Sequence, residues 1–141
     1  ETIEDSYFEV DLDGRFTYTN GALLNMLNAE GNDILGQKLT HYIPDDEESK
    51  HIQAYFRKAL IDGKPVRGVQ YKAQPQSGLP LDTEASITPI REIQGEIVGF
   101  RAVARDISLR KEAERELHRA KRAAERANRM KSEFLANLSI K

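Results

Sequence analysis

The stretch that decides the fold is residues 66–108, which read VRGVQYKAQPQSGLPLDTEASITPIREIQGEIVGFRAVARDIS. Three segments in it alternate apolar and polar residues, as half-buried β-strands do. These segments are 66–73, 81–90 and 97–107. Gln76-Ser77-Gly78 and Gln94-Gly95-Glu96 separate them and are typical of turns. We therefore predict a three-stranded antiparallel meander.

Two further strands are expected near the N-terminus. Tyr7–Leu12 alternates apolar and polar residues, and Arg15–Thr19 returns after the tight turn at Asp13-Gly14. Strands at both ends of a sequence, with helices between them, are typical of an α+β domain. We therefore predict one five-stranded antiparallel sheet with short helices on one of its faces.

The expected helices lie between these two groups of strands. Asn20 is placed to cap a short helix that carries three leucines. Residues 28–46 contain Gly and Pro and predict only short helical turns. Asp45–Ile61 has the period of an amphipathic helix, which Asp62-Gly63 ends.

A long helix is predicted at the C-terminal end. No Gly or Pro follows Gly99, and residues 109–138 would run about 45 Å as one helix. Small and apolar residues recur there with the alternating spacing of a coiled coil. This apolar seam consists of Ala113, Leu117, Ala120, Ala124, Ala127, Phe134 and Leu138. We predict a parallel homodimer through it, and the alternative is a helix folded back on its own domain.

The composition excludes several kinds of chemistry. The 141 residues include no cysteine, which excludes disulfides, thiolate metal sites and a cysteinyl bond to a flavin. No apolar run approaches the roughly 20 residues that span a bilayer, and no secretory leader is visible. We expect a cytoplasmic chain, which can still be one piece of a membrane-anchored protein.

Charge is distributed unevenly along the chain. Residues 1–109 hold 11 Lys and Arg against 18 Asp and Glu, whereas residues 110–131 hold 9 Lys and Arg against 4 Glu. The basic residues surround the helix and no aromatic residue is interleaved with them. We therefore favour a solvated helix and expect no nucleic-acid partner.

Taken together, these motifs resemble a PAS domain over about residues 3–108. The resemblance is carried by Asp13-Gly14-Arg15, Asn20, Ile34-Leu35-Gly36-Gln37, Gly63-Lys64-Pro65-Val66, Ser86–Ile90, Gly99-Phe100 and Arg105-Asp106-Ile107-Ser108. It implies a PAS fold and two parts, a sensory domain at 1–108 and a signalling helix at 109–141. It also implies a dimer through both parts.

The end of the helix resembles a second family. Lys131–Ser139 is similar to the run that precedes the phosphoaccepting histidine of sensor histidine kinases. Ile140 and Lys141 stand where that family usually has His and Glu, so the chain was cut there or the natural protein lacks the acceptor. The chain also shows no Gly-rich nucleotide loop. We expect it not to be an enzyme by itself, and we expect its partner to be the kinase catalytic domain of a longer protein.

The resemblance places a small-molecule ligand between the sheet and the longer helix. Alternation predicts that Val98, Phe100, Ala102 and Ala104 face inward, while Arg101 and Arg105 face outward. Arg67, Val69 and Tyr71 are expected to share one face, and which face that is stays open. The candidate ligand-binding residues are His51, Tyr55, Arg67, Val69, Tyr71, Ala85, Ile87, Phe100 and Ala102.

His51 has a second interpretation, as an axial ligand of haem. Its distance from Pro44 resembles the histidine helix of haem-binding PAS sensors, but position 54 is Ala and the nearby Tyr is residue 55. We favour a surface histidine, and the cofactor stays unknown. No metal site is expected, since His41 and His118 lack a ligand spacing and Asp45–Glu48 fits a solvated helix start.

Arg105, Asp106 and Ser108 are the candidate signal-coupling residues, because they lie where the sheet becomes the helix. Asp106 could act as the helix N-cap or pair with a nearby Arg or Lys. The leading hypothesis is a sensory and dimerisation module of a two-component sensor histidine kinase. The alternatives are a ligand-free PAS dimerisation module and a haem-based gas sensor.

Overall fold

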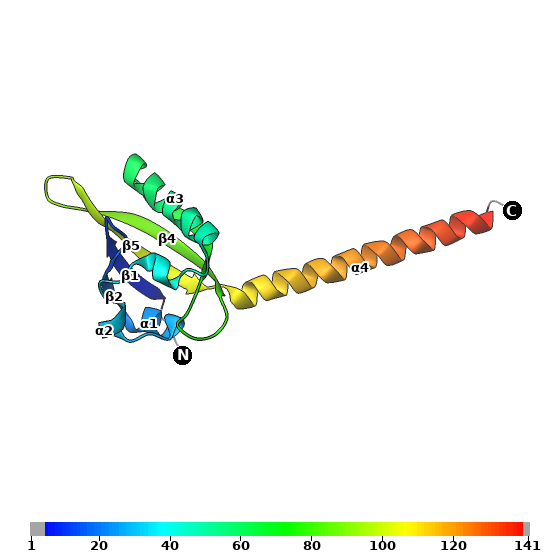
Figure 1. Ribbon diagram of the computed structural model, residues 1–141. Helices are drawn as coiled ribbons and strands as arrows, with labels where there is room; N and C mark the ends of the chain where they lie inside the picture. Colours follow the sequence, from blue (N-terminus) through cyan, green and yellow to red (C-terminus); the bar gives the residue numbers. More distant parts are fainter. Residues whose placement is uncertain (1–4, 140–141) are drawn as a thin grey trace. The chain divides into compact units, whose positions relative to one another are not determined.

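The computed structural model describes residues 5–139 (Figure 1). Ile140 and Lys141, which stand at the positions expected for the acceptor His and the following Glu, lie outside the described residues. The chain divides into two compact units, Glu1–Ile107 and Ser108–Lys141. The first unit contains five strands: β1 (Ser6–Asp11), β2 (Phe16–Thr19), β3 (Val66–Ala73), β4 (Leu81–Arg91) and β5 (Ile97–Asp106). They form one antiparallel sheet in the order β2-β1-β5-β4-β3, which confirms the predicted sheet.

Four short or medium helices connect the two groups of strands. They are α1 (Gly21–Leu27), α2 (Gly31–Ile34), the 3-10 helix η1 (Leu39–Tyr42) and α3 (Asp46–Asp62). Asn20 caps α1 as predicted, since its side chain accepts a hydrogen bond from Leu23 N at 3.0 Å. Asp45 caps α3 in the same way through Glu48 N at 2.8 Å, and Gly63 ends that helix in the left-handed conformation.

The core lies between one face of the sheet and these helices. Because side chains alternate along a strand, the register Phe8↔Ala102 and Ala85↔Ala104 places all four side chains on the same inner face. Leu23 of α1 and Ile52 of α3 complete this core, and each is about as fully buried as the strand residues. Burial of this apolar surface is the main contribution to the stability of the unit.

Two β-bulges correct predictions that assumed strict alternation. In β5, the pairing steps from Ile90↔Gly99 to Arg91↔Ile97, so the extra residue Val98 turns outward and is 37 % exposed. Ile97 packs against the core in its place. A bulge inserts one unpaired residue, so the side chains beyond it in the same strand face the opposite side of the sheet from the one that strict alternation predicts.

The second bulge lies in β3. Its pairing steps from Val66↔Ile87 to Val69↔Ala85, so that Arg67 and Gly68 stand opposite a single residue of β4. Gly68 has φ +68°, a backbone conformation that glycine adopts without strain. Val66 and Val69 therefore face the core while Arg67 is exposed on the other side, and the expectation that Arg67 shares a face with Val69 and Tyr71 was wrong.

The second unit is the single helix α4 (Ser108–Ser139) of 32 residues, which confirms the predicted long helix. It begins at Ser108, two residues after Asp106, which is the last residue of β5. Ile107 is buried and its N–H donates to Asp82 O at 2.8 Å, which ties the residue before α4 to β4. Across residues 5–139, no helix has the length and apolar character needed to cross a membrane.

Candidate functional site

The candidate site is a cleft of about 330 Å³ at the open margin of the first unit. It is lined by residues 10–14 of the β1–β2 hairpin, residues 38–40, five residues of α3 and Phe100 of β5. Its volume is at the lower end of the range of about 300–1,000 Å³ that is usual for small-molecule sites. The cleft therefore suits a small ligand.

The floor of the cleft is apolar and closely packed. Ile52 and Phe100 are almost fully buried, and the rings of Phe56 and Phe100 meet edge to face with centroids 5.3 Å apart. Val10 and Leu39 are buried beside them. Phe56 of α3 and Phe100 of β5 thus hold one another in place at the contact between helix and sheet.

The rim of the cleft is formed in part by the hairpin turn. Asp11 Oδ1 accepts hydrogen bonds from Asp13 N at 2.9 Å and Arg15 N at 3.0 Å, and Gly14 has φ +82°. Leu39 N donates to Gly14 O at 2.8 Å, which fixes residues 38–40 against the turn. The Asp-Gly turn signal in the sequence therefore also determines one wall of the site.

Charged side chains stand around this rim. Asp13 and Lys38 are exposed on the hairpin side, and Arg57 is exposed on α3. Within residues 5–139, none of these three side chains takes part in a hydrogen bond or an ion pair. The cleft thus combines an apolar floor with three solvated charges, which is the arrangement of a site for an amphipathic molecule.

Of the nine residues predicted to bind a ligand, Phe100 alone lines this cleft. Five others are buried in the core between sheet and helices: Val69, Tyr71, Ala85, Ile87 and Ala102. Burial raises the pKa of the Tyr71 hydroxyl above its usual value. Sequence alternation found the inner face correctly, but it does not show whether inner-face side chains leave a space between them.

The lining residues that sequence reasoning missed come from the hairpin turn, residues 38–40 and one side of α3. On α3, Gln53, Arg57 and Leu60 follow helical spacing and flank the buried Ile52 and the partly buried Phe56. This spacing is the one signal in the sequence that could have found them, since it places Gln53 and Arg57 along the edge of the apolar stripe. Nothing in the sequence indicated that Lys38 lines the same cleft.

His51 and Tyr55 lie elsewhere on α3. His51 Nε2 is 3.0 Å from Gln70 O, and because a carbonyl only accepts, Nε2 carries the proton. The His51 and Tyr55 rings meet edge to face at 5.1 Å. The imidazole therefore caps the edge strand β3 and lies outside the cleft, so the residues present do not fit an axial haem ligand at His51. Among the described residues, no group of three or more His, Asp or Glu could hold a metal ion.

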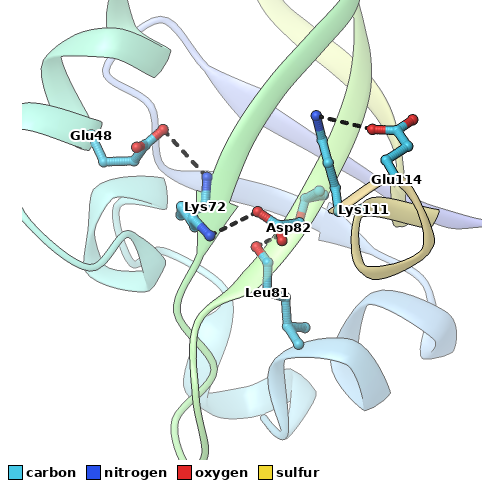
Figure 2. Close-up of polar contacts among 7 residues, drawn as sticks. Glu48, Lys72, Leu81, Asp82, Lys111 and Glu114 are labelled. Carbon is cyan, nitrogen blue, oxygen red and sulfur yellow. Dashed lines mark hydrogen bonds and ion pairs between the residues drawn. The ribbon is translucent and has the colours of Figure 1, made fainter. Parts of the chain in front are cut away.

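A chain of polar contacts runs from α3 to the last residue of the first unit. Lys72 N donates to Glu48 Oε1 at 3.3 Å, and Lys72 Nζ lies 2.8 Å from Asp82 Oδ1, as Figure 2 shows. Asp82 O then accepts the hydrogen bond from Ile107 N. Glu48 is on the helix that carries the cleft residues, so these contacts join the cleft helix to the residue before Ser108 through the edge of the sheet.

The predicted coupling residues lie at the end of β5 and the start of α4. Arg105 is exposed and its Nη2 lies 3.2 Å from Asp5 Oδ2. Asp106 is the last residue of β5, and Ser108 is the first residue of α4. Their positions agree with a place at the junction, whereas the contacts that reach back to α3 belong to Lys72 and Asp82.

The apolar seam of α4 is solvent-exposed along the helix. Leu117 is 72 % exposed, Phe134 61 % and Leu138 53 %, and no described residue of α4 is buried. Leu109, Met130 and Leu135 are exposed as well. Such a row of large apolar side chains is unusual on a helix that stays single.

Comparison with known proteins gives a family and a fold. The family model described as PAS fold matches residues 1–107. Among solved structures, the PAS domain of a protein from Colwellia psychrerythraea is 19 % identical with a TM-score of 0.68, covering 74 % of this chain and 86 % of that one. The PAS domain of the fruit-fly ELK potassium channel is 16 % identical with a TM-score of 0.61, covering 74 % and 87 %.

A third structure extends further along this chain. An RNA-binding light-oxygen-voltage receptor is 19 % identical with a TM-score of 0.69, covering 83 % of this chain and 33 % of that one. At these identities the likeness shows the fold alone. A search of curated proteins found no match.

Proposed function

Because the chain belongs to the PAS family, we propose that it is the sensory and dimerisation module of a two-component sensor histidine kinase. Residues 1–107 receive the stimulus, and α4 pairs with α4 of a second copy and carries the change onward. The module catalyses nothing by itself, and the kinase chemistry resides in another domain of the longer protein. The resemblance of Lys131–Ser139 to the run before a phosphoaccepting histidine supports this output.

The observation that carries the proposal is the exposed seam of α4. A lone helix with Leu117, Phe134 and Leu138 in water loses the stabilisation that burial would give, about 1.5–3 kcal/mol for each large side chain. Pairing in parallel through a heptad seam recovers it. The alanines at positions 120, 124 and 127 make the seam weak, so two packings of the pair can differ by only a few kcal/mol and a stimulus can shift between them.

The contacts from Glu48 through Lys72 and Asp82 to Ile107 support a route for the stimulus. A ligand in the cleft would contact Ile52, Phe56 or Arg57 of α3 and so act on the helix that carries Glu48. A movement of α3 along its axis would displace Lys72 through its backbone N–H. Lys72 Nζ would then act on the Asp82 carboxylate and so on β4, whose Asp82 carbonyl accepts the hydrogen bond from Ile107 N. The route thus begins at the cleft and ends one residue before α4.

Disulfide cross-linking tests the parallel pair, and the absence of native cysteine makes the readout free of background. We expect Ala120→Cys and Ala124→Cys each to form disulfide dimers on mild oxidation, because residues on the seam of a parallel pair meet their own copies. Ala136→Cys is the matched control, since by heptad spacing it lies opposite the seam. Dimer yields at positions 120 and 124 no higher than at 136 would contradict the parallel coil.

The kinase output is tested on the full-length protein. Incubation with ATP labelled at the γ-phosphate should give an acid-labile protein phosphate, as a phosphohistidine is. If the full-length protein stays unlabelled while α4 still cross-links, the proposed kinase output is wrong and the proposed dimer stands.

A ligand-free dimerisation module is a second candidate. The observation that favours it is the packing of Val69, Ala85, Ile87 and Ala102, which are buried against the helices. Such a module would give the same cross-links as the sensory one and would bind nothing in the cleft. A haem-based sensor is not proposed, because His51 is engaged with Gln70 O and lies outside the cleft.

A further inference from the structure

We infer that the cleft between α3 and the β1–β2 hairpin binds a small amphipathic monocarboxylate, with a flat apolar body on the floor and the carboxylate between Lys38 and Arg57. This inference rests on the proposed sensory function and adds the class of ligand. The cleft is not the space within the core where the predicted residues Val69, Ala85 and Ile87 lie, since they are packed against one another.

The body of the ligand follows from the floor. Val10, Leu39, Ile52, Phe56 and Phe100 present apolar surface, and no charged side chain is buried among them. The Phe56 and Phe100 rings, held edge to face at 5.3 Å, both line the cleft, and aromatic surface of this kind suits a planar group. Burying such a group contributes about 25 cal/mol for each Å² of apolar area removed from water.

The charge of the ligand follows from the rim. Four charged side chains line the cleft: Asp11, Asp13, Lys38 and Arg57. The Asp11 carboxylate already accepts two backbone hydrogen bonds within its own turn. Of the remaining three, two are cations, and neither Lys38 nor Arg57 forms an ion pair with Asp13 or with any other residue that the structure describes. The two cations and two carboxylates of the lining cancel in formal charge. Lys38 and Arg57 nevertheless lack an ion-pair partner among the described residues, and a single ligand carboxylate would supply one.

Arg57 and Lys38 have different parts in this arrangement. A planar guanidinium matches a carboxylate with two parallel N–H donors, whereas an ammonium acts as a point charge. Asp13 on the hairpin side of the rim repels a second negative charge. A dicarboxylate or a phosphate ester should therefore bind less well than a monocarboxylate of the same body.

The size of the cleft sets the upper limit. At about 330 Å³ it is near the lower end of small-molecule sites, and one or two fused rings with one carboxylate fit within it. The class is thus aromatic acids of this size.

The test uses three probes with the same body: 2-naphthoate, its neutral amide 2-naphthamide, and naphthalene-2,6-dicarboxylate. Each is titrated into the whole chain and followed by two-dimensional NMR of the backbone amides. We expect saturable shifts at Gly14, Leu39 and Phe56, with naphthoate bound about threefold to tenfold more tightly than the amide, as for a charge-assisted contact at a solvated rim. The dicarboxylate should bind less tightly than naphthoate, because Asp13 repels its second charge.

Two matched variants identify the cation. Arg57→Gln should remove most of the preference for naphthoate over the amide, while Lys58→Gln, the next residue on the same helix and outside the cleft, should keep it. Circular dichroism melting of both variants confirms that each is folded. Equal affinity for naphthoate and amide, equal effects of the two variants, shifts centred away from the cleft, or no saturable binding at millimolar probe would overturn the inference. If the probes fail to bind but Ala120→Cys still cross-links, the ligand class is wrong and the proposed dimer stands. If the probes bind as expected but Ala120→Cys does not cross-link, the proposed dimer is wrong and the ligand class stands.

Discussion

At the scale of single residues, a few side chains fix the local geometry on which the cleft and the junction depend. Asn20 Oδ1 accepts from Leu23 N to cap α1 and from Tyr7 N to hold β1, each at 3.0 Å. At position 99 the packing accepts only glycine, because a Cβ there would come within 2.4 Å of Val10 O. Asn20 thus secures the first helix to the sheet, and Gly99 allows β5 to lie close to β1 beside the cleft.

Tyr71 makes a pH-dependent contribution to stability. Burial raises the pKa of its hydroxyl in the folded state above the unfolded value of about 10. The stability that depends on the neutral hydroxyl is therefore fully present below about pH 10 and is lost as the pH rises beyond it. We expect Tyr71→Phe to lose less of its free energy of unfolding than the parent chain between about pH 9 and pH 11.

Urea unfolding at the two pH values measures this difference, and the exposed Tyr18 supplies the control variant Tyr18→Phe. An alkaline loss as large in Tyr71→Phe as in Tyr18→Phe would show that Tyr71 is not the residue responsible.

At the scale of elements, α3 connects the cleft to the edge of the sheet. β3 is an edge strand, and its exposed backbone groups invite pairing with other chains. Glu48 and His51 lie one turn apart on α3. Glu48 accepts a hydrogen bond from Lys72 N and His51 donates one to Gln70 O, so together they cover that edge. The side of α3 that holds the edge strand and the side that lines the cleft thus belong to one rigid helix.

Lys72→Gln should loosen the end of β4 without unfolding the domain. The Lys72–Asp82 pair is partly solvated, with 47 % and 19 % of the two side chains exposed, so its loss should cost no more than about 1 kcal/mol. Because Asp82 O accepts the Ile107 N–H, we expect the protection of the Ile107 amide against hydrogen exchange to fall more than that of amides in β1.

Hydrogen exchange followed by NMR compares this variant with Lys50→Gln, an exposed lysine on α3 that lies outside the pair. Equal protection of Ile107 in both variants would remove Lys72 from the proposed route.

At the scale of the whole molecule, the two units obtain their stability in different ways. Residues 6–107 bury a continuous core between sheet and helices, whereas α4 buries none of its described residues. A long isolated helix gains only weak support from pairs such as Arg119–Glu116 at 3.3 Å. The first unit should therefore fold alone, and α4 should be stable only when it is paired.

Removal of α4 tests this division. We expect residues 1–107 to melt at a temperature independent of protein concentration. We expect the whole chain to sediment as a dimer whose helix content rises with concentration, because association is linked to folding of α4. Analytical ultracentrifugation and circular dichroism measure both. If residues 1–107 dimerise as tightly as the whole chain, the main dimer contact lies in the PAS unit, which would contradict pairing through α4.

The sequence by itself determined the strands, their antiparallel order in the meander, the cap at Asn20 and the length of α4, because each depends on periodicity and on turn or cap chemistry within a few residues. Tertiary structure alone decided the rest. The bulges at Arg67-Gly68 and Val98 depend on how neighbouring strands pair, and alternation along one strand cannot show them. The cleft lies between α3 and a hairpin that is about 40 residues away in the sequence. It exists because the side chains between helix and sheet do not fill the space there. Whether they fill it depends on their volumes in the folded state, which no local sequence pattern shows.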